Sequence, residues 1–171
     1  MKLIFYIKGG AGKVLAATPA ILKKYEVEKA KHTDLLDCIV ISSYPELWDN
    51  LGVTALHIKE LQNFYSNNVK DKECMIYAHD PYDEGDYIAE KINLVEAFFK
   101  IYGIQDLYNQ DLPIIKFTDE ELAEVDAALE PFADKPPMAI QISGGPENQN
   151  TSFSWTRDLH VSQAEPVAHV L

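Results

Sequence analysis

The sequence contains few basic residues, and this shortage excludes two classes of binding partner. Its 171 residues include 15 Lys and Arg against 27 Asp and Glu, which gives a formal net charge of −12 at pH 7. A nucleic-acid-binding protein needs a basic face that displaces counterions from phosphates. An anionic membrane surface likewise attracts basic segments. We therefore expect neither a nucleic acid nor a charged membrane surface as a partner.

Long apolar runs and cysteine clusters are also lacking. No apolar run is long enough to cross a bilayer, and residues 1–6 are too short for the apolar core of a signal peptide. Cys38 and Cys74 are the only cysteines, and neither belongs to a CxxC pair. Isolated cysteines are typical of reduced core residues, with a surface disulfide as the less favoured alternative. We therefore expect a cytoplasmic protein without a transmembrane segment.

What is present is an alternation of β-prone and helical segments. The β-prone runs are residues 2–7, 38–42, 53–58 and 74–79, and the helical segments are residues 14–25, 92–102 and 118–132. Their apolar spacing distinguishes the two kinds of segment. Strands that alternate with helices are typical of a parallel sheet covered on both faces. The predicted fold is therefore α/β, a Rossmann-like parallel sheet flanked by helices.

Local signals indicate where these helices begin and end. Pro19 lies inside the first helical segment. Either the helix begins with Thr18 as its N-cap, or a first turn before the proline is kinked. Gly103 is expected to end the second helix. Thr118 and Glu121 have the spacing of a capping box and are expected to begin the third.

A double proline divides the sequence into two predicted parts. Residues 134–137, Asp-Lys-Pro-Pro, are typical of a linker, and residues 138–143 form a new β-prone run after it. Few further elements follow, so a second α/β unit is expected to be begun and not completed. We expect a first domain over residues 1–134, and a linker with the first strand and helix of an incomplete second domain over residues 135–171.

The first strand is followed by a glycine loop with two possible functions. Residues 8–13, Lys-Gly-Gly-Ala-Gly-Lys, lie between a strand and a helix, where backbone amides bind anions. These six residues match the KGGxGK core of a ParA/MinD-type ATPase loop, which indicates a phosphate- or nucleotide-binding module. A P-loop has Ser or Thr directly after its lysine to bind Mg²⁺, and Val14 stands there. The alternative is that the glycines only permit a tight turn.

The same region resembles a family of sugar-transferring enzymes. Residues 12–21 (GKVLAATPAI) are similar to the opening of glycosyltransferase family 9, which contains the ADP-heptose:lipopolysaccharide heptosyltransferases. Further segments resemble that family in the same order, at residues 42–51, 92–104, 113–121 and 139–155. The resemblance implies a GT-B fold, in which two Rossmann-like domains face each other across a cleft.

The resemblance also implies an activity and a division of labour. It implies metal-independent transfer of a sugar from a nucleotide-sugar donor to a glycan or lipid-linked acceptor, as in lipopolysaccharide biosynthesis, with no cofactor. The first domain would hold the acceptor and the incomplete second domain the donor, so the fragment is expected to be incomplete or inactive alone. The implied acceptor-binding residues are Gly10, Gly12, Lys13, Tyr44, Asp80 and Tyr82. The implied donor-binding residues are Ser143, Gly144 and Gly145.

The base position of the family is altered in this sequence. The family has an aspartate after the loop glycine, and this sequence has Lys13 there. A protonated lysine cannot accept a proton, although it can hold a phosphate or a carboxylate. The family's basic residue before the tryptophan is also absent, since Phe153 and Ser154 precede Trp155. These departures fit an altered substrate, a different base or a degenerate relative.

A replacement base is sought on an acidic loop that follows a predicted strand. Asp80 is the first candidate, and the loop also contains His79, Asp83, Glu84 and Asp86. Because ligands of α/β sheets bind at the carboxyl ends of strands, loops 8–13, 42–46 and 79–87 are expected to border one cleft. The alternatives for the acidic loop are a solvated turn or a metal site, and its spacing matches no EF-hand. No metal ligand is therefore assigned.

Overall fold

The structure is a computed structural model that describes residues 1–32 and 37–132. The chain divides into two compact units, Met1–Leu122 and Ala123–Leu171, and the first contains every strand discussed below. The expected domain boundary after residue 134 lies outside the described residues, as do the linker and the strand expected after it. Within the described ranges, no helix has both the length and the apolar character needed to cross a bilayer.

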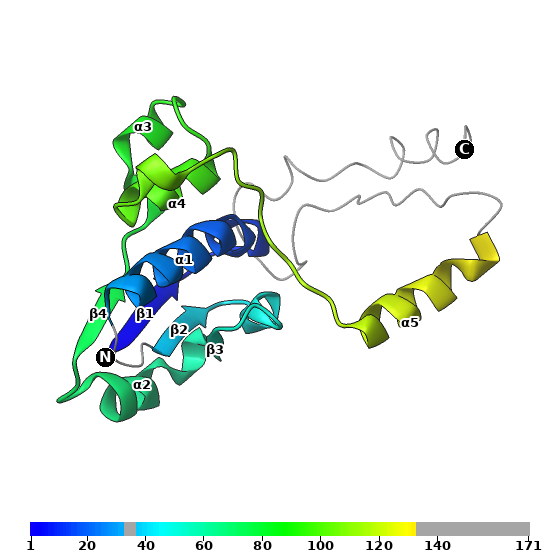
Figure 1. Ribbon diagram of the computed structural model, residues 1–171, viewed down its shortest axis with the longest axis horizontal. Helices are drawn as coiled ribbons and strands as arrows, with labels where there is room; N and C mark the ends of the chain where they lie inside the picture. Colours follow the sequence, from blue (N-terminus) through cyan, green and yellow to red (C-terminus); the bar gives the residue numbers. More distant parts are fainter. Residues whose placement is uncertain (33–36, 133–171) are drawn as a thin grey trace, which may run out of the picture. The chain divides into compact units, whose positions relative to one another are not determined.

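Four parallel strands form the sheet of the first unit (Figure 1). They are β1 (Lys2–Ile7), β2 (Asp37–Ser42), β3 (Thr54–His57) and β4 (Cys74–Tyr77), in the order β3-β2-β1-β4. This order matches the first four strands of the Rossmann order 3-2-1-4-5-6. The prediction of a Rossmann-like α/β fold is therefore confirmed.

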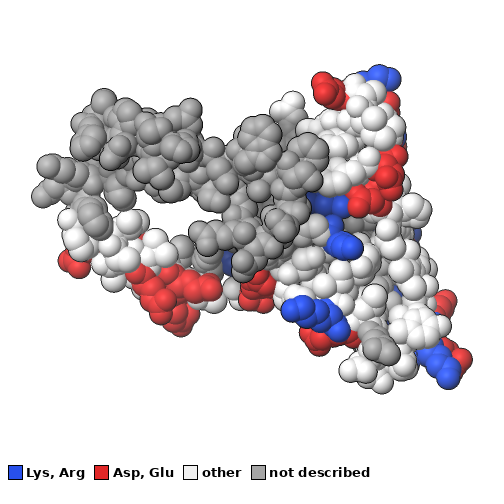
Figure 2. Space-filling view, turned by 180° about the vertical axis from the view of Figure 1, so that it is seen from behind, with Lys and Arg blue, Asp and Glu red and all other residues white. Residues whose placement is uncertain are grey.

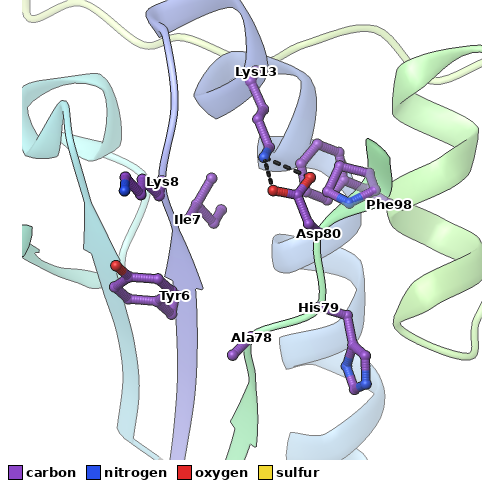
Figure 3. Close-up of a pocket in the computed structure, with 9 residues that line it drawn as sticks. Tyr6, Ile7, Lys8, Lys13, Ala78, His79, Asp80 and Phe98 are labelled. Carbon is purple, nitrogen blue, oxygen red and sulfur yellow. Dashed lines mark hydrogen bonds and ion pairs between the residues drawn. The ribbon is translucent and has the colours of Figure 1, made fainter. Parts of the chain in front are cut away.

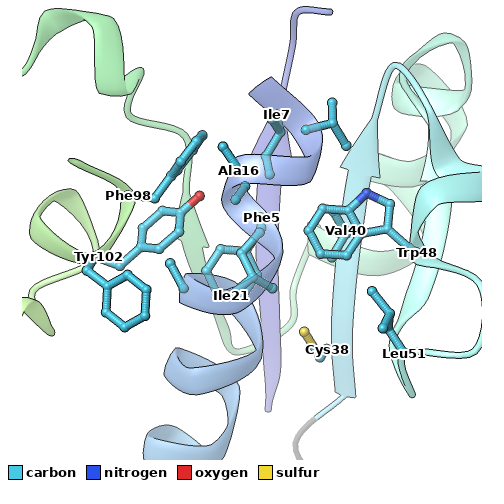
Figure 4. Close-up of a cluster of buried hydrophobic side chains, with 14 of the residues drawn as sticks. Phe5, Ile7, Ala16, Ile21, Cys38, Val40, Trp48, Leu51, Phe98 and Tyr102 are labelled. Carbon is cyan, nitrogen blue, oxygen red and sulfur yellow. The ribbon is translucent and has the colours of Figure 1, made fainter. Parts of the chain in front are cut away.

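Two helices cover one face of the sheet. They are α1 (Ala11–Lys31) and α4 (Leu94–Ile101), which pack against each other. Side chains alternate along a strand, so Phe5 and Ile7 of β1 face these helices and Ile4 faces the opposite side. Figure 4 shows Phe5 beside α1, with Phe98 and Tyr102 next to it. Both aromatic residues belong to the buried core.

The other elements of the described residues, apart from α5, are short. Phe64 of α2 (Leu61–Phe64) packs on Ile4, Ile39 and Ile41. The other short elements are η1 (Pro45–Trp48), η2 (Ile58–Glu60), η3 (Tyr65–Val69), η4 (Pro81–Asp83), α3 (Gly85–Ile88), η5 (Gln105–Leu107) and η6 (Glu130–Phe132). The acidic loop after β4 is therefore folded into short helical turns rather than being an irregular loop.

One of the two interpretations of Pro19 is wrong. Helix α1 begins at Ala11 and continues through Pro19, so Thr18 is not its N-cap. A proline has no N–H to donate to the carbonyl of Leu15, four residues earlier. The Thr18 hydroxyl donates to that carbonyl instead, at 2.8 Å, and accepts from the Ile114 N–H at 2.7 Å. Its hydrogen bonds therefore replace the missing helical bond and attach a distant segment.

The other helix-end signals are confirmed. Gly103 follows α4 with a φ of 67°, a left-handed conformation that favours glycine, and its N–H donates to the Lys100 carbonyl. Thr118 and Glu121 form the expected capping box at the start of α5 (Asp119–Leu129), with bonds of 2.7 and 3.1 Å. Figure 2 shows acidic side chains gathered over this helix, which has no basic residue in its last turn.

The cysteines of the described residues are both free. Cys38 is buried in the core beside α1, and burial raises the pKa of its thiol to about 12. A thiol with so high a pKa is protonated at neutral pH and unreactive. Cys74 is part-buried at the start of β4. The reduced core cysteine expected from the sequence is therefore present at Cys38.

Candidate functional site

The candidate site lies where the chain leaves two neighbouring parallel strands. Strands β1 and β4 are adjacent in the sheet but not consecutive in the chain, and β2 and β3 lie on the other side of β1. In doubly wound sheets, ligands bind outside the carboxyl ends of the strands at such a point. The residues that follow Ile7 and Tyr77 are therefore the first place to seek a site.

A hollow is present at this place (Figure 3). Its volume is about 260 Å³, part of which is open solvent. The hollow is small and partly open to solvent, so it does not enclose a whole ligand. It is lined by Tyr6, Ile7, Lys8, Lys13, Ala78, His79, Asp80, Pro81 and Phe98.

Lys13 and Asp80, which both line the hollow, form an ion pair. The Lys13 Nζ lies 2.7 Å from Asp80 Oδ1 and 2.6 Å from Oδ2. The Lys13 side chain comes from the first turn of α1 and is 6% exposed, whereas the Asp80 side chain is 42% exposed. Figure 3 shows the two side chains pointing toward each other from α1 and from the segment after β4. Lys13 acts here as a cation that donates to a carboxylate.

The surroundings of Asp80 determine how readily it takes a proton. Partial burial raises the pKa of the carboxyl, but the Lys13 ammonium and the Tyr82 N–H together outweigh burial and hold that pKa below its usual range. The Tyr82 N–H donates to Asp80 Oδ1 at 3.0 Å, which also caps η4. Asp80 is therefore ionised at neutral pH, and it is a weak base as long as Lys13 holds both oxygens.

Aromatic rings lie on two sides of this ion pair. The Lys13 Nζ lies 4.5 Å from the centroid of the Tyr82 ring, within the range of a cation–π contact. Tyr82 stacks on Tyr87 with centroids 5.7 Å apart, and Tyr82 remains 49% exposed. Tyr102 is the second ring and is buried. Its burial is the main cause that raises the pKa of its phenol, and the Asp80 charge raises that pKa further. The site thus combines a carboxylate, an ammonium and an accessible tyrosine ring.

The glycine loop at residues 8–13, a glycine elbow between β1 and α1, gives Lys13 the space to reach Asp80. Gly9 has a φ of 139°, and a Cβ added there would lie 2.9 Å from Lys13 Cδ. A side chain at Gly9 would therefore strain the backbone and displace Lys13. A Cβ added at Gly10 or Gly12 meets no atom within 4 Å. The Gly9 N–H donates to Ser43 Oγ at 3.4 Å, so the elbow also touches the segment after β2.

The structure brings together some of the predicted site residues and separates others. Lys13 and Asp80 line the hollow, and Tyr82 is in contact with both. Gly10 and Gly12 are exposed on the elbow, and Tyr44 is half-buried against the main core instead of lining the hollow. The implied donor-binding residues lie outside the described residues, namely Ser143, Gly144 and Gly145.

Several residues of the acidic loop have structural partners. Glu84 accepts from the Asp86 and Tyr87 N–H groups and lies 2.6 Å from the Lys100 Nζ, and Asp86 also pairs with Lys100. The Lys100 ammonium holds the pKa of both carboxyls below their usual ranges. Figure 3 shows the His79 ring pointing away from Asp80. In residues 1–32 and 37–132, no group of three His, Cys, Asp or Glu side chains is placed to hold a metal.

Some residues that line the hollow were not among the predicted site residues. Ile7 and Ala78 lie at the ends of neighbouring strands, and the rule for parallel sheets pointed to these ends without naming them. Phe98 is 1% exposed in the core and is also part of the lining. Apolar spacing identifies such a residue as buried but does not show that it also borders a cavity.

No protein-family model, curated protein or solved structure matches this chain. Its function is therefore inferred from the site itself: a carboxylate, an ammonium and a tyrosine ring at the carboxyl ends of two adjacent parallel strands.

Proposed function

We propose that this chain is the acceptor-side half of a glycosyltransferase with a GT-B fold. It would bind a glycan or lipid-linked acceptor while a second Rossmann-like domain presents a nucleotide sugar. The observation that carries the proposal is the position of Asp80 and Tyr82, side by side at the carboxyl ends of β1 and β4. The heptosyltransferase-like sequence of residues 12–21 supports it.

These two residues suit the chemistry of a sugar. A carboxylate accepts hydrogen bonds from sugar hydroxyls, since it has only acceptor sites when ionised. A tyrosine ring offers an apolar surface to the C–H face of a sugar ring. Asp80 is 42% exposed and Tyr82 is 49% exposed. Asp80 lines the hollow, and Tyr82 lies beside it in contact with Lys13.

Asp80 takes the role of the base in this proposal. The acceptor hydroxyl gives its proton to Asp80, and its oxygen forms a bond to the anomeric carbon of the donor sugar. The bond from that carbon to the nucleotide diphosphate breaks, and its electron pair stays on the diphosphate. No metal takes part in these steps. Lys13 replaces the family's base but remains beside the carboxylate that takes over its role.

The alternative of a Mg²⁺-dependent ATPase loop has weaker support. Val14 follows the loop lysine and is 0% exposed in the core, so it presents no oxygen to a metal. The Lys13 ammonium is engaged by Asp80 rather than being directed over the glycine loop. A P-loop requires a hydroxyl ligand after its lysine and a lysine that reaches the phosphates.

Saturation-transfer NMR with this chain tests the proposal. A panel of hexoses and heptoses, with their phosphates, is added to the wild type and to Tyr82→Ala. We expect saccharide signals that depend on Tyr82. Tyr65→Ala is the matched control, because Tyr65 is a comparably exposed tyrosine (58%) on η3, which leads into the amino end of β4 rather than following its carboxyl end. Binding of ATP with Mg²⁺ that is lost in Lys13→Met, without any saccharide binding, contradicts the proposal.

A further inference from the structure

One lysine of a neighbouring helix holds the turn that follows Tyr82. The Lys100 Nζ of α4 lies 2.6 Å from Glu84 Oε1, and the same ammonium pairs with Asp86. The Glu84 side chain is 12% exposed and the Lys100 side chain 29% exposed, so water screens their contact less than it screens a pair on the open surface. Because two carboxylates share the ammonium, the three side chains form a network, which orders its members better than an isolated surface pair does.

Helix α4 is a rigid support for Lys100. The three residues before this lysine, Ala97, Phe98 and Phe99, are each at most 1% exposed. The helix packs against α1 as well as against η4. Side chains that are packed in a core keep their backbone in place. Lys100 is therefore a fixed point to which a less well packed turn is attached.

Glu84 passes this attachment on to the backbone of the next turn. Its second oxygen, Oε2, accepts from the Asp86 N–H at 2.9 Å and from the Tyr87 N–H at 3.0 Å, which caps α3. Helix α3 is only four residues long, and one helical turn has little stability of its own. The position of Tyr87 therefore depends on the Glu84 carboxylate, whose other oxygen Lys100 holds.

Tyr87 in turn restrains the ring of Tyr82. The two rings are stacked, with centroids 5.7 Å apart and an angle of 27° between their planes. An exposed tyrosine changes its rotamer rapidly, on the picosecond to nanosecond scale, and Tyr82 is 49% exposed. Stacking on Tyr87 opposes such changes and keeps the Tyr82 ring beside the Lys13 ammonium, 4.5 Å from its centroid. A ring that is already ordered loses less entropy when a ligand packs on it.

From these contacts we infer that Lys100 is a positioning residue of the acceptor site, which orders the Tyr82 ring beside the hollow. Lys100 acts through the Glu84 cap and the Tyr87 ring, and it does not itself touch the sugar. The inference rests on the proposed function and adds to it a residue outside the hollow. The carboxylate of Glu84 then serves as a link to the tyrosines rather than as a base.

An NMR signature of the ring tests the inference without a ligand. Because the Tyr82 ring faces the Lys13 ammonium, its ring current shifts the resonances of the adjoining Lys13 Cε protons. Tyr82→Ala gives the position of these resonances without the ring. We expect Lys100→Met to move them toward that position, and Lys100→Arg to restore them because it keeps a cation for the carboxylates. A loss of stability alone would not move these resonances in the folded protein.

Sugar binding to the same variants tests the effect on the acceptor. Each hexose and heptose of the saturation-transfer panel, D-glucose included, is titrated into the wild type, Lys100→Met and Lys100→Arg. We expect Lys100→Met to weaken binding about threefold to tenfold, because the sugar must then order the tyrosine ring itself. Lys100→Arg should bind like the wild type. The matched control is Lys91→Met, since Lys91 is an exposed lysine that pairs with Asp86 rather than with Glu84.

A variant of the last link tests the inference even if Lys100→Met does not fold. Tyr87→Ala removes the ring that stacks on Tyr82 but leaves the Lys100–Glu84 pair and the backbone N–H that Glu84 caps. We expect it to shift the Lys13 resonances and weaken sugar binding as Lys100→Met does. Tyr87→Phe keeps the ring and should behave like the wild type.

The outcomes separate this inference from the proposed function. If sugar binding depends on Tyr82 but is unchanged in Lys100→Met and Tyr87→Ala, the proposed function stands and the inference is overturned. It is likewise overturned if Lys91→Met acts as strongly as Lys100→Met, or if Lys100→Arg does not restore the resonances. If the resonances respond as expected but no sugar binds to the wild type, the ordering of Tyr82 by Lys100 is supported and the saccharide function fails.

Discussion

The ammonium of Lys13 and the carboxylate of Asp80 meet at 2.6 Å although 67 positions separate them in the chain. Lys13 follows β1 by way of the glycine elbow, and Asp80 follows β4. The pair forms because these strands are parallel neighbours, so their carboxyl ends lie at the same edge of the sheet. Lys13 of the glycine loop and Asp80 of the loop after β4 therefore belong to the same site.

Removal of Lys13 should raise the pKa of Asp80. In Lys13→Met, burial still disfavours the ionised carboxyl, while the ammonium that outweighed it is gone. We therefore expect the pKa to rise from below its usual range to that range or higher. An NMR titration of the Asp80 carboxyl carbon measures the change. An unchanged pKa would show that Lys13 does not hold Asp80 in solution.

Removal of the Asp80 charge should destabilise the fold. Asp80→Asn leaves the Lys13 ammonium, with its side chain 6% exposed, facing a neutral amide. Breaking a fully buried pair costs several kcal/mol, but Asp80 is 42% exposed, so water compensates part of the loss. We expect a decrease of about 1–2 kcal/mol in the free energy of unfolding. The control is Asp83→Asn, an exposed acid on the same turn, which should change stability little in urea unfolding.

Two glycines of the elbow, Gly9 and Gly12, should respond in opposite directions to alanine. Gly9→Ala places a side chain at a φ of 139° and against Lys13 Cδ, so we expect a loss of about 1–3 kcal/mol. Gly12→Ala adds a methyl group within α1 where nothing lies within 4 Å, and we expect a gain of about 0.5 kcal/mol. Thermal and urea unfolding measure both changes. Equal effects at the two positions would contradict the described elbow.

The Thr18 hydroxyl should be needed to hold the segment around Ile114 against α1. Thr18→Val keeps the shape of a fully buried side chain but leaves the Ile114 N–H and the Leu15 carbonyl without this partner. A buried unsatisfied group costs about 1–3 kcal/mol, and amide exchange at Ile114 should become faster. Thr54→Val, at the exposed first position of β3, is the matched control and should be nearly neutral. Unchanged exchange at Ile114 would show that the bond does not form.

The pairing of Lys100 with Glu84 and Asp86 should make stability depend on pH in the acid range. The Lys100 ammonium lowers the pKa of both carboxyls. Their contribution is thus fully present above the unfolded pKa values of about 4 and is lost as the pH falls through the lowered folded values. Melting temperatures of the wild type should fall in that range more steeply than those of Lys100→Met. Lys59→Met, an exposed lysine of η2, should retain the steep fall.

The sequence by itself determined the order and kind of the main elements. Apolar runs ended within two residues of the ends of β1, β2, β3 and β4. For β1 and β2 the reason is that strands buried on both faces leave a continuous apolar signal. Gly103 and the Thr118 capping box gave helix ends correctly, since these signals act through backbone groups of neighbouring residues. Local chemistry of this kind is readable without a structure.

The bounds expected for the first helix differ from those of α1 at both ends. Pro19 favours a helix start, but the hydroxyl of Thr18 satisfies the carbonyl that Pro19 leaves free, and helix α1 begins at Ala11 instead. The first helix also continues to Lys31, beyond the expected end near residue 25, as Lys24 and Glu28 pair at 2.9 Å within it. Both partnerships are local, at spacings of four and three residues, and the expected helix bounds did not take them into account.

For the site, the sequence named Lys13, Asp80 and Tyr82 separately, and only the tertiary structure decided that they are in contact. Strand order is the physical reason. Residues at the carboxyl ends of parallel strands meet only if those strands are neighbours, and the placement of β4 beside β1 is set by packing over the whole sheet. The same packing excluded Tyr44 from the hollow and included Phe98. A residue's chemistry is written in the sequence, whereas its neighbours depend on which strands pair.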